Sequence, residues 1–292
     1  MESTSKNLQA PEKKPCICSR FLAALGKFFK KHWIDILVVC GIAALLVWFG
    51  MYVAERFNFA GKWKTFYNYF VTNGGYNDLL KGMKNTGWIA VFGLLIGIGI
   101  GIVIAVVKLI PSQKRVVNYL KRFCSIYVAF FRGTPIVVQL LLGWYILLPL
   151  LGITMDRVMS CTLIFGLNSG AYISEIMRGG INSVDPGQLE AARAVGLSFP
   201  ISMIKIVIPQ AIKNILPTLG NEFIALIKET AIVGYVGALD ITKYFNDQGT
   251  NSYEPMLPYL VMALLYIVIV AVIASLVKLL ERSLAKNERR KS

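Results

Sequence analysis

The sequence has little charge and few of the groups that commonly carry out enzyme chemistry. Only 16% of the 292 residues are charged and only one is a histidine, whereas charged residues make up about a quarter of an ordinary soluble domain. No G-x-x-x-x-G-K-[ST] phosphate loop and no H-E-x-x-H zinc motif occurs. The composition excludes a soluble enzyme and a disordered tail protein, and the missing phosphate loop removes the usual P-loop site for ATP.

Cysteine is also scarce. The chain has five cysteines, an odd number that argues against a secreted disulfide scaffold. The pair Cys16-x-Cys18 has no third or fourth metal ligand nearby. We therefore expect reduced thiols and no metal site.

Long runs without charge are abundant. Hydrophobic residues make up 55% of the chain, and about 20 apolar residues in a row cross the hydrocarbon core of a bilayer. Four charge-free stretches have 19 to 23 residues and a fifth has 17: 36–54, 85–107, 133–155, 255–277 and 158–174. The sequence therefore predicts an all-α protein, a polytopic helical bundle in a membrane.

Six membrane spans are expected once a more polar segment, 209–227, is included. The expected spans are 33–54, 86–110, 123–151, 158–177, 209–227 and 259–277. If the chain starts in the cytoplasm, the inside segments hold 21 of the 31 basic residues and the outside loops hold 8. Positive charge favours the cytoplasmic side, so we expect both termini there, with residues 1–32 as a basic cytoplasmic tail.

Two spans carry marked backbone features. Gly93, Gly97, Gly101 and Ala105 are four residues apart, which leaves one helical face nearly bare and allows another helix to approach closely. The third span is interrupted around Pro135, and irregular backbone at membrane depth is tolerated only beside protein or a water-filled cavity.

The fifth span is unusually polar. It carries Lys213, Asn214, Asn221 and Glu222, although a charge at the bilayer centre costs about 2.5 to 3.5 kcal/mol on insertion scales. This span is expected to face its own bundle or an aqueous path, and the retained polar groups indicate a function.

The inside segment 185–208 predicts a protruding corner made of two short helices. Asp185 is a suitable cap, Pro186 fits the first turn, and Gly196 is a natural stop. Ser198 can cap a second helix that we expect to end before Pro209. We expect such a corner to be a binding site for a protein partner.

The same segment carries a family resemblance. EAARAVGLSFPISMIKIVIPQA resembles the loop motif of ABC importer permeases, with Glu190, Ala191, Ala192, Gly196, Ile206 and Pro209 at the motif positions and Ile208 where leucine is more usual. FRGTPIVVQ, which ends at Gln139, and SGAYISEIMRGGI, which starts at Ser169, look like the polar amino acid uptake subfamily, the histidine/glutamine type. The resemblance covers about 79–284, so span 33–54 is an addition to the usual five-helix core.

This resemblance implies the permease subunit of a type I importer in the bacterial plasma (inner) membrane. Glu190, Ala191, Ala192, Gly196 and Leu197 would couple it to a cytoplasmic ABC ATPase subunit, which would hold ATP and Mg²⁺, so this chain would be no enzyme and bind no cofactor. An extracytoplasmic amino acid binding protein would deliver the solute. The permease would form a homodimer or heterodimer surrounded by membrane lipid, and no nucleic acid partner is expected.

The solute's contacts are expected among polar side chains near broken helices. A zwitterionic amino acid needs an acceptor for its ammonium group and donors for its carboxylate. The candidates are Thr134, Gln139, Asn168, Ser169, Tyr172, Glu175, Asn221 and Glu222. The alternative for each is helix packing, with Arg132 or Arg178 pairing with Glu175 or Glu222.

Two other functions remain open. An ion-coupled secondary amino acid transporter would use Glu175, Glu222 and Glu229 as relays, although the sequence has no convincing internal repeat. An intramembrane enzyme would need a Ser-Lys dyad built on Ser169 or Ser174. The identity of the amino acid is not readable from the sequence.

Overall fold

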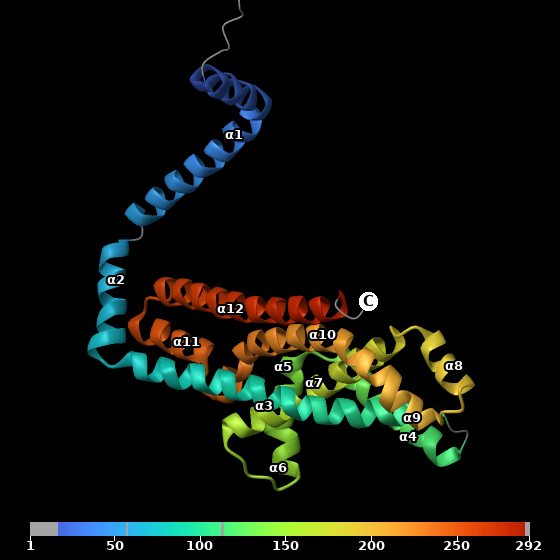
Figure 1. Cartoon of the computed structure of the whole chain (residues 1–292). Helices are drawn as coiled ribbons and strands as arrows, with labels where there is room; N and C mark the ends of the chain where they lie inside the picture. The colour runs from blue at the N-terminus through green and yellow to red at the C-terminus, as the bar shows by residue number, and fades with distance from the viewer. Residues whose placement is uncertain (1–16, 57, 112–113, 290–292) are drawn as a thin grey trace, which may run out of the picture. The chain divides into compact units, whose positions relative to one another are not determined.

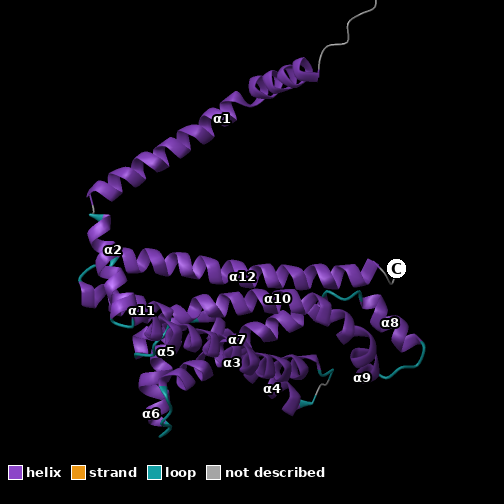
Figure 2. Ribbon diagram, turned by 60° about the vertical axis from the view of Figure 1, so that its left-hand side comes forward, coloured by secondary structure: helices purple, strands orange, loops and turns teal. Residues whose placement is uncertain are grey.

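The computed structural model describes residues 17–56, 58–111 and 114–289, and this part of the chain consists of helices joined by short turns and loops (Figures 1 and 2). It divides into two compact units, 1–61 and 62–292. The first part of the predicted tail, 1–16, lies outside the described residues.

The first unit is dominated by helix α1 (Ile17–Arg56). This helix begins well before the expected span 33–54, so the second half of the predicted tail is helical. Its stretch Leu37–Glu55 is long and apolar enough to cross a membrane, and none of the side chains in that window is buried. Near the end of the stretch the rings of Trp48 and Tyr52 stack with centroids 5.8 Å apart.

The remaining elements follow one another with short connections. They are α2 (Phe59–Tyr67), a π-helical turn (Asn68–Thr72), α3 (Gly75–Leu109), α4 (Arg115–Gly133), α5 (Ile136–Leu142), a second π turn (Gly143–Leu147), α6 (Leu148–Leu150), α7 (Arg157–Asn182), α8 (Pro186–Ala194), α9 (Phe199–Ser202), a third π turn (Met203–Val207), α10 (Ile208–Glu229), a 3-10 helix (Thr230–Val236), α11 (Ile241–Ser252) and α12 (Met256–Arg289).

The centre of the second unit is the pair α3 and α7, which make the most extensive contact between helices. The glycines of α3 explain how closely they pack. A Cβ atom built on Gly97 would lie 2.9 Å from Cβ of Ser169, and one on Gly101 would lie 2.7 Å from Cγ2 of Ile173. A side chain at either position would displace α7, so the expected packing face on this helix is confirmed.

A sharp bend separates α4 from α5. The chain bends by 109° between the helical stretches Arg115–Gly133 and Ile136–Leu150. Pro135 has no backbone N–H to continue the ladder of α4, and the residue before a proline is pushed out of the helical region. Thr134 is accordingly extended, with φ −120° and ψ 146°. The interruption predicted from the sequence is present.

Five crossings are apparent from length and composition in the described part of the chain. Four continuous stretches qualify, and the bent pair adds a fifth if it is one span: Leu37–Glu55, Gly75–Leu109, Phe199–Val236, Met256–Ser283, and Arg115–Gly133 with Ile136–Leu150. The remaining expected span, 158–177, corresponds to α7, whose 26 residues extend about 39 Å. It is less apolar than the other stretches because it is the central helix, with Ser160, Asn168 and Ser169 buried against its neighbours.

The second unit has two distinct ends. In both views α8 and α9 lie at one end, where α3 and α12 finish, and α11 lies at the other (Figures 1 and 2). At the α11 end, Gly82 of α3 touches the backbone of Asp240, since a Cβ there would lie 2.7 Å from its carbonyl oxygen. Long helices α10 and α12 run side by side between the two ends.

Candidate functional site

The predicted corner at α8 is built as the sequence indicates. The Asp185 carboxylate accepts from the backbone N–H of Gly187 at 2.9 Å and caps the helix. At the other end Gly196 adopts φ +86°, and the N–H groups of Gly196 and Leu197 donate to the carbonyls of Arg193 and Ala192 at 3.0 and 3.1 Å. These two bonds close the helix as a Schellman motif, which fixes the direction of the chain after it.

The five expected coupling residues differ in exposure. Glu190, Ala191 and Gly196 are exposed, Leu197 is half-buried, and Ala192 is only 3% exposed. Ala192 therefore faces inward, where α8 packs against the Met203–Val207 turn. Val195 was not among the predicted residues. It is 78% exposed at the tip of the corner, where it presents an apolar surface.

The second helix of the corner does not end before Pro209, so that expectation was wrong. Ser198 occupies its cap position without a side-chain capping bond, and the chain stays helical from Phe199 through α10. The π turn Met203–Val207 lies directly before the proline. A π turn changes the hydrogen-bond register locally, which allows Pro209 to enter the helix without a stop.

The bend between α4 and α5 is held by the buried side chain of Gln139. Its amide N–H₂ lies 2.8 Å from the carbonyl of Phe131, 2.8 Å from Oγ1 of Thr134 and 3.0 Å from the carbonyl of Thr134. Its Oε1 accepts from the amide of Asn168 on α7 at 2.8 Å. Carbonyls that lose their helical partner at the bend are satisfied in this way, so three of the predicted pathway residues, Thr134, Gln139 and Asn168, form one structural network.

Ser169 and Glu222 form a second polar contact on another side of α7. The Ser169 hydroxyl is completely buried and donates to Oε1 of Glu222 on α10 at 2.9 Å. Glu222 is half-buried. Both residues were predicted for the pathway. They are 53 residues apart in the sequence, and the structure brings them together from two different helices.

Glu175 is engaged in ion pairs at the α8 end of α7. Its two oxygens lie 3.1 Å from Nζ of Lys108 and 2.6 Å from Nη2 of Arg178. The predicted pairing with Arg178 is confirmed, whereas Lys108 of α3 was missed. Periodicity within α7 reveals an i,i+3 partner, but no pattern in the sequence connects it to a lysine on a different helix.

The remaining two candidates lie apart from these networks. The guanidinium of Arg132 stacks over the ring of Tyr172 with 5.5 Å between Cζ and the ring centroid. Asn221 is exposed on α10. Within the described ranges no three His, Cys, Asp or Glu side chains gather as metal ligands do.

At the opposite end, Asp240 caps α11 from a buried position. Its carboxylate accepts from the backbone N–H groups of Thr242 and Lys243 at 3.0 and 2.8 Å. Burial raises the pKa of this carboxyl, and the hydrogen bonds from Lys243 and Thr242 oppose that rise. The pKa of the neighbouring Tyr244 phenol is raised to about 12, also by burial.

Known proteins share most of this architecture. The model of the family described as binding-protein-dependent transport system inner membrane component matches residues 93–286. The arginine transport system permease protein ArtQ of Bacillus subtilis is 38% identical over 210 residues, which is 72% of this chain and 94% of ArtQ. The putative glutamine transport system permease protein GlnP of Rickettsia bellii is 36% identical over 206 residues, which is 70% of this chain and 92% of GlnP.

A solved structure agrees with these relatives. The crystal structure of an amino acid ABC transporter with histidines has a chain that is 37% identical, with a TM-score of 0.66. The match covers 73% of this chain and 98% of that one. All three relatives therefore match along nearly their whole length, while more than a quarter of this chain has no counterpart in them.

Proposed function

This chain belongs to the family of binding-protein-dependent transport system inner membrane components and is the permease of an amino acid ABC importer; we propose that a separate ATPase subunit binds the α8 corner and moves it as ATP is hydrolysed. The observation that carries the proposal is the closed corner itself. Its ends are fixed by the Asp185 cap and the Gly196 turn, and the residues between them are mostly exposed. A rigid exposed helix transmits a push to the bundle, whereas a flexible loop would absorb it.

The same proposal gives the chain its orientation and partners. The α8 end faces the cytoplasm of a bacterium, with both termini on that side of the inner membrane. ATP and Mg²⁺ are held by the ATPase subunit, and this chain has no ATPase activity of its own. A binding protein delivers amino acid at the α11 end, and the permease works as a dimer of identical or related copies.

Glu222 is the proposed acceptor for the solute's ammonium group. Its carboxylate lies on α10, the most polar of the expected spans, and its described hydrogen bond comes from a neutral hydroxyl, that of Ser169. Glu175, in contrast, already pairs with two cations. The relatives named for arginine and glutamine support a polar amino acid as the solute.

The ion-coupled alternative is not favoured, because the solved relative is an amino acid ABC transporter and ArtQ is named as a transport system permease. The energy source tests it directly. In vesicles that contain the permease, ATPase and binding protein, uptake should persist when an uncoupler collapses the ion gradient at constant ATP. Uptake that disappears under these conditions would restore the secondary transporter.

Gly196→Val tests the coupling role of the corner. A β-branched residue cannot adopt φ +86° without strain, although the space around Gly196 is open. We expect a folded permease that binds the ATPase but takes up amino acid at least tenfold more slowly per ATP hydrolysed. The matched control is Gly152→Val, which also has positive φ, +65°, and open surroundings, but lies in the loop after α6.

The control separates strain from coupling. Both variants should lose a similar amount of thermal stability, and only the change at Gly196 should lower uptake per ATP. Equal and normal coupling in the two variants would remove α8 from the proposed path of force.

A further inference from the structure

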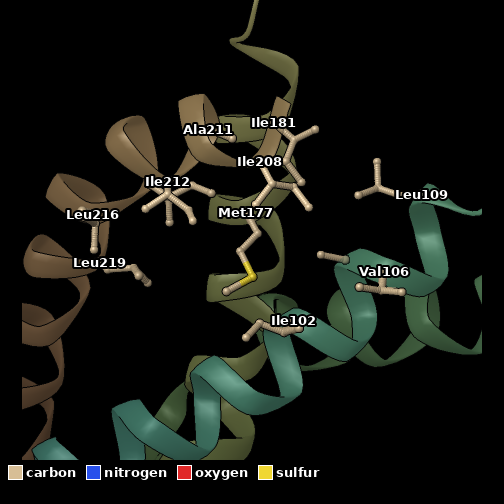
Figure 3. A pocket seen from close by; sticks show the side chains of 12 residues that line it. Ile102, Val106, Leu109, Met177, Ile181, Ile208, Ala211, Ile212, Leu216 and Leu219 are labelled. Atoms are coloured by element: carbon tan, nitrogen blue, oxygen red, sulfur yellow. The ribbon is translucent and has the colours of Figure 1, made fainter. Parts of the chain in front are cut away.

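A wholly apolar groove runs along α3, α7 and α10 towards the α8 end. It has a volume of about 310 Å³. Figure 3 shows the side chains of 12 lining residues, with Met177 of α7 pointing into the space between α3 and α10. No lining residue carries a polar side chain, so the groove offers no partner for the charged ends of an amino acid.

The groove is open along one side. Ile102 and Val106 of α3 are 47% and 55% exposed, and Ile212 and Leu216 of α10 are 45% and 44% exposed. All four lie in stretches that are long and apolar enough to cross a membrane. The open side therefore faces either hydrocarbon or another protein, and its length runs along the helices, as an acyl chain does in a bilayer.

Two basic side chains lie on segments next to the end of the groove. Leu109, the last residue of α3, lines it, and the ammonium of Lys121 donates to the carbonyl of the next residue, Ile110, at 2.7 Å. Lys205 is exposed in the turn before Ile208, whereas Lys108, which precedes Leu109, is already paired with Glu175. Cationic side chains at the end of an apolar channel match the phosphate of a phospholipid.

The groove also continues beneath the corner. A second hollow of about 270 Å³ shares Leu109 and Ile181 with it and extends to Asp185, Leu189 and Phe199. The end of the groove is therefore next to the inner side of α8, the helix proposed to receive force from the ATPase.

We propose that this groove holds one acyl chain of a membrane phospholipid, with the lipid phosphate beside Lys121 and Lys205. The chain fills a channel that no polar solute would enter, and its head lies next to the base of α8. This lipid is a bound component of the permease and is distinct from the bilayer around it. The assignment does not depend on which amino acid is carried.

Val106→Trp tests the site by filling the groove from its open side. The full chain, with any partner subunits that copurify, is washed extensively in mild detergent, and the retained phospholipid is counted by native mass spectrometry. We expect about one phospholipid per wild-type chain and at least a fivefold loss in the variant. The matched control is Val272→Trp on α12, where Val272 is 56% exposed; this change should alter retention less than twofold. Equal retention in both variants would overturn the site.

A second measurement uses the wild-type chain, in case the tryptophan prevents folding. Vesicles are made with phosphatidylglycerol that carries a photoactivatable group in its acyl chain. After illumination, adducts on Met177 should exceed those on exposed Leu264 of α12 at least fivefold. Adducts confined to exposed positions such as Leu264 would refute the proposal. So would efficient cross-linking of two Val106→Cys chains to each other, since a second copy would then occupy the groove.

Discussion

Two neighbouring residues of α7 lead to polar contacts of different kinds. Asn168 donates to Gln139, which in turn serves the backbone of the bend at Thr134. Ser169 donates to a carboxylate on a different helix, Glu222. The first network joins neutral groups and satisfies backbone carbonyls. The second leaves a negative group on the helix with the most polar expected span.

The difference shows how one buried helix serves two purposes. A polar network that pairs neutral donors with displaced carbonyls is explained by the bend that it stabilises. A carboxylate held by one hydroxyl is not explained in this way, because a charged group inside a membrane protein is costly unless it has a partner or a task. We therefore assign Gln139 and Asn168 to structure, and Ser169 and Glu222 to the proposed solute pathway.

The largest effect is expected from Gln139→Leu, which removes the hydrogen-bond network at the bend and so tests its structural role. The change removes the bonds that Gln139 makes to the carbonyls of Phe131 and Thr134 and to the amide of Asn168, and leaves only the longer 3.4 Å bond from Asn168 to the Phe131 carbonyl. Each unsatisfied buried group costs about 1 to 3 kcal/mol, so the permease should lose about 3 kcal/mol of stability or more. Thermal unfolding of the purified permease in detergent measures the loss.

Gln248→Leu is the matched control for that change. Gln248 is 1% exposed, comparable to Gln139 at 4%, but neither atom of its amide has a hydrogen-bond partner in the described part of the chain. Its replacement should be neutral or slightly stabilising. If both glutamine variants unfold at the same temperature, the bend does not depend on the Gln139 network.

Glu222→Gln should have the next largest effect, on uptake and not on stability. Glutamine keeps the shape and can still accept from Ser169, but it removes the charge that attracts an ammonium group. We expect amino acid uptake in reconstituted vesicles to fall about 100-fold, equivalent to about 2.7 kcal/mol, with an unfolding temperature close to that of the wild type.

The control for Glu222 is Glu281→Gln, a change at an exposed position on α12, which should leave uptake unchanged. Normal uptake by the Glu222 variant would show that this carboxylate serves helix packing and not transport. Both polar contacts of α7 would then be structural.

Local patterns in the sequence were sufficient for the α8 corner. Asp185 and Gly196 were predicted as its start and stop, and the cap bond and the left-handed glycine are both present. Capping depends on residues within a few positions of each other, so it is readable from one sequence. The glycine face of α3 was predictable for the same reason.

Contacts between distant segments could not be predicted. Glu175 is 67 residues from Lys108, and Gln139 is 29 residues from Asn168. Both pairs depend on how the helices pack, which periodicity does not specify. The continuation of the helix through Pro209 was missed because a proline normally marks a boundary, and the π turn that accommodates it has no sequence signature of its own.

Ser169→Ala should lower amino acid uptake by a smaller factor than Glu222→Gln. It retains the Cβ that packs against Gly97 and removes only the 2.9 Å hydrogen bond to Glu222. A hydrogen bond to a charged group contributes about 1.5 to 3 kcal/mol, so uptake should fall roughly tenfold. Ser174→Ala is the control, since that buried hydroxyl donates to a carbonyl of its own helix, Ala171. Equal uptake by both variants would contradict a specific role for Ser169.

Asp240→Asn should give the smallest effect, because it changes how stability depends on pH and keeps one of the two capping bonds of α11. Burial raises the folded-state pKa of this carboxyl. The resulting stabilisation is complete below the ordinary value of 3.8 and is lost as the pH rises through the raised folded value. Asparagine also caps helices but does not titrate, so the decline in unfolding temperature above pH 4 should be shallower in the variant. Asp156→Asn, at the exposed cap of α7, is the control and should not reproduce this flattening. If the wild type and the Asp240 variant decline in parallel, the buried Asp240 carboxyl does not set the pH dependence of stability.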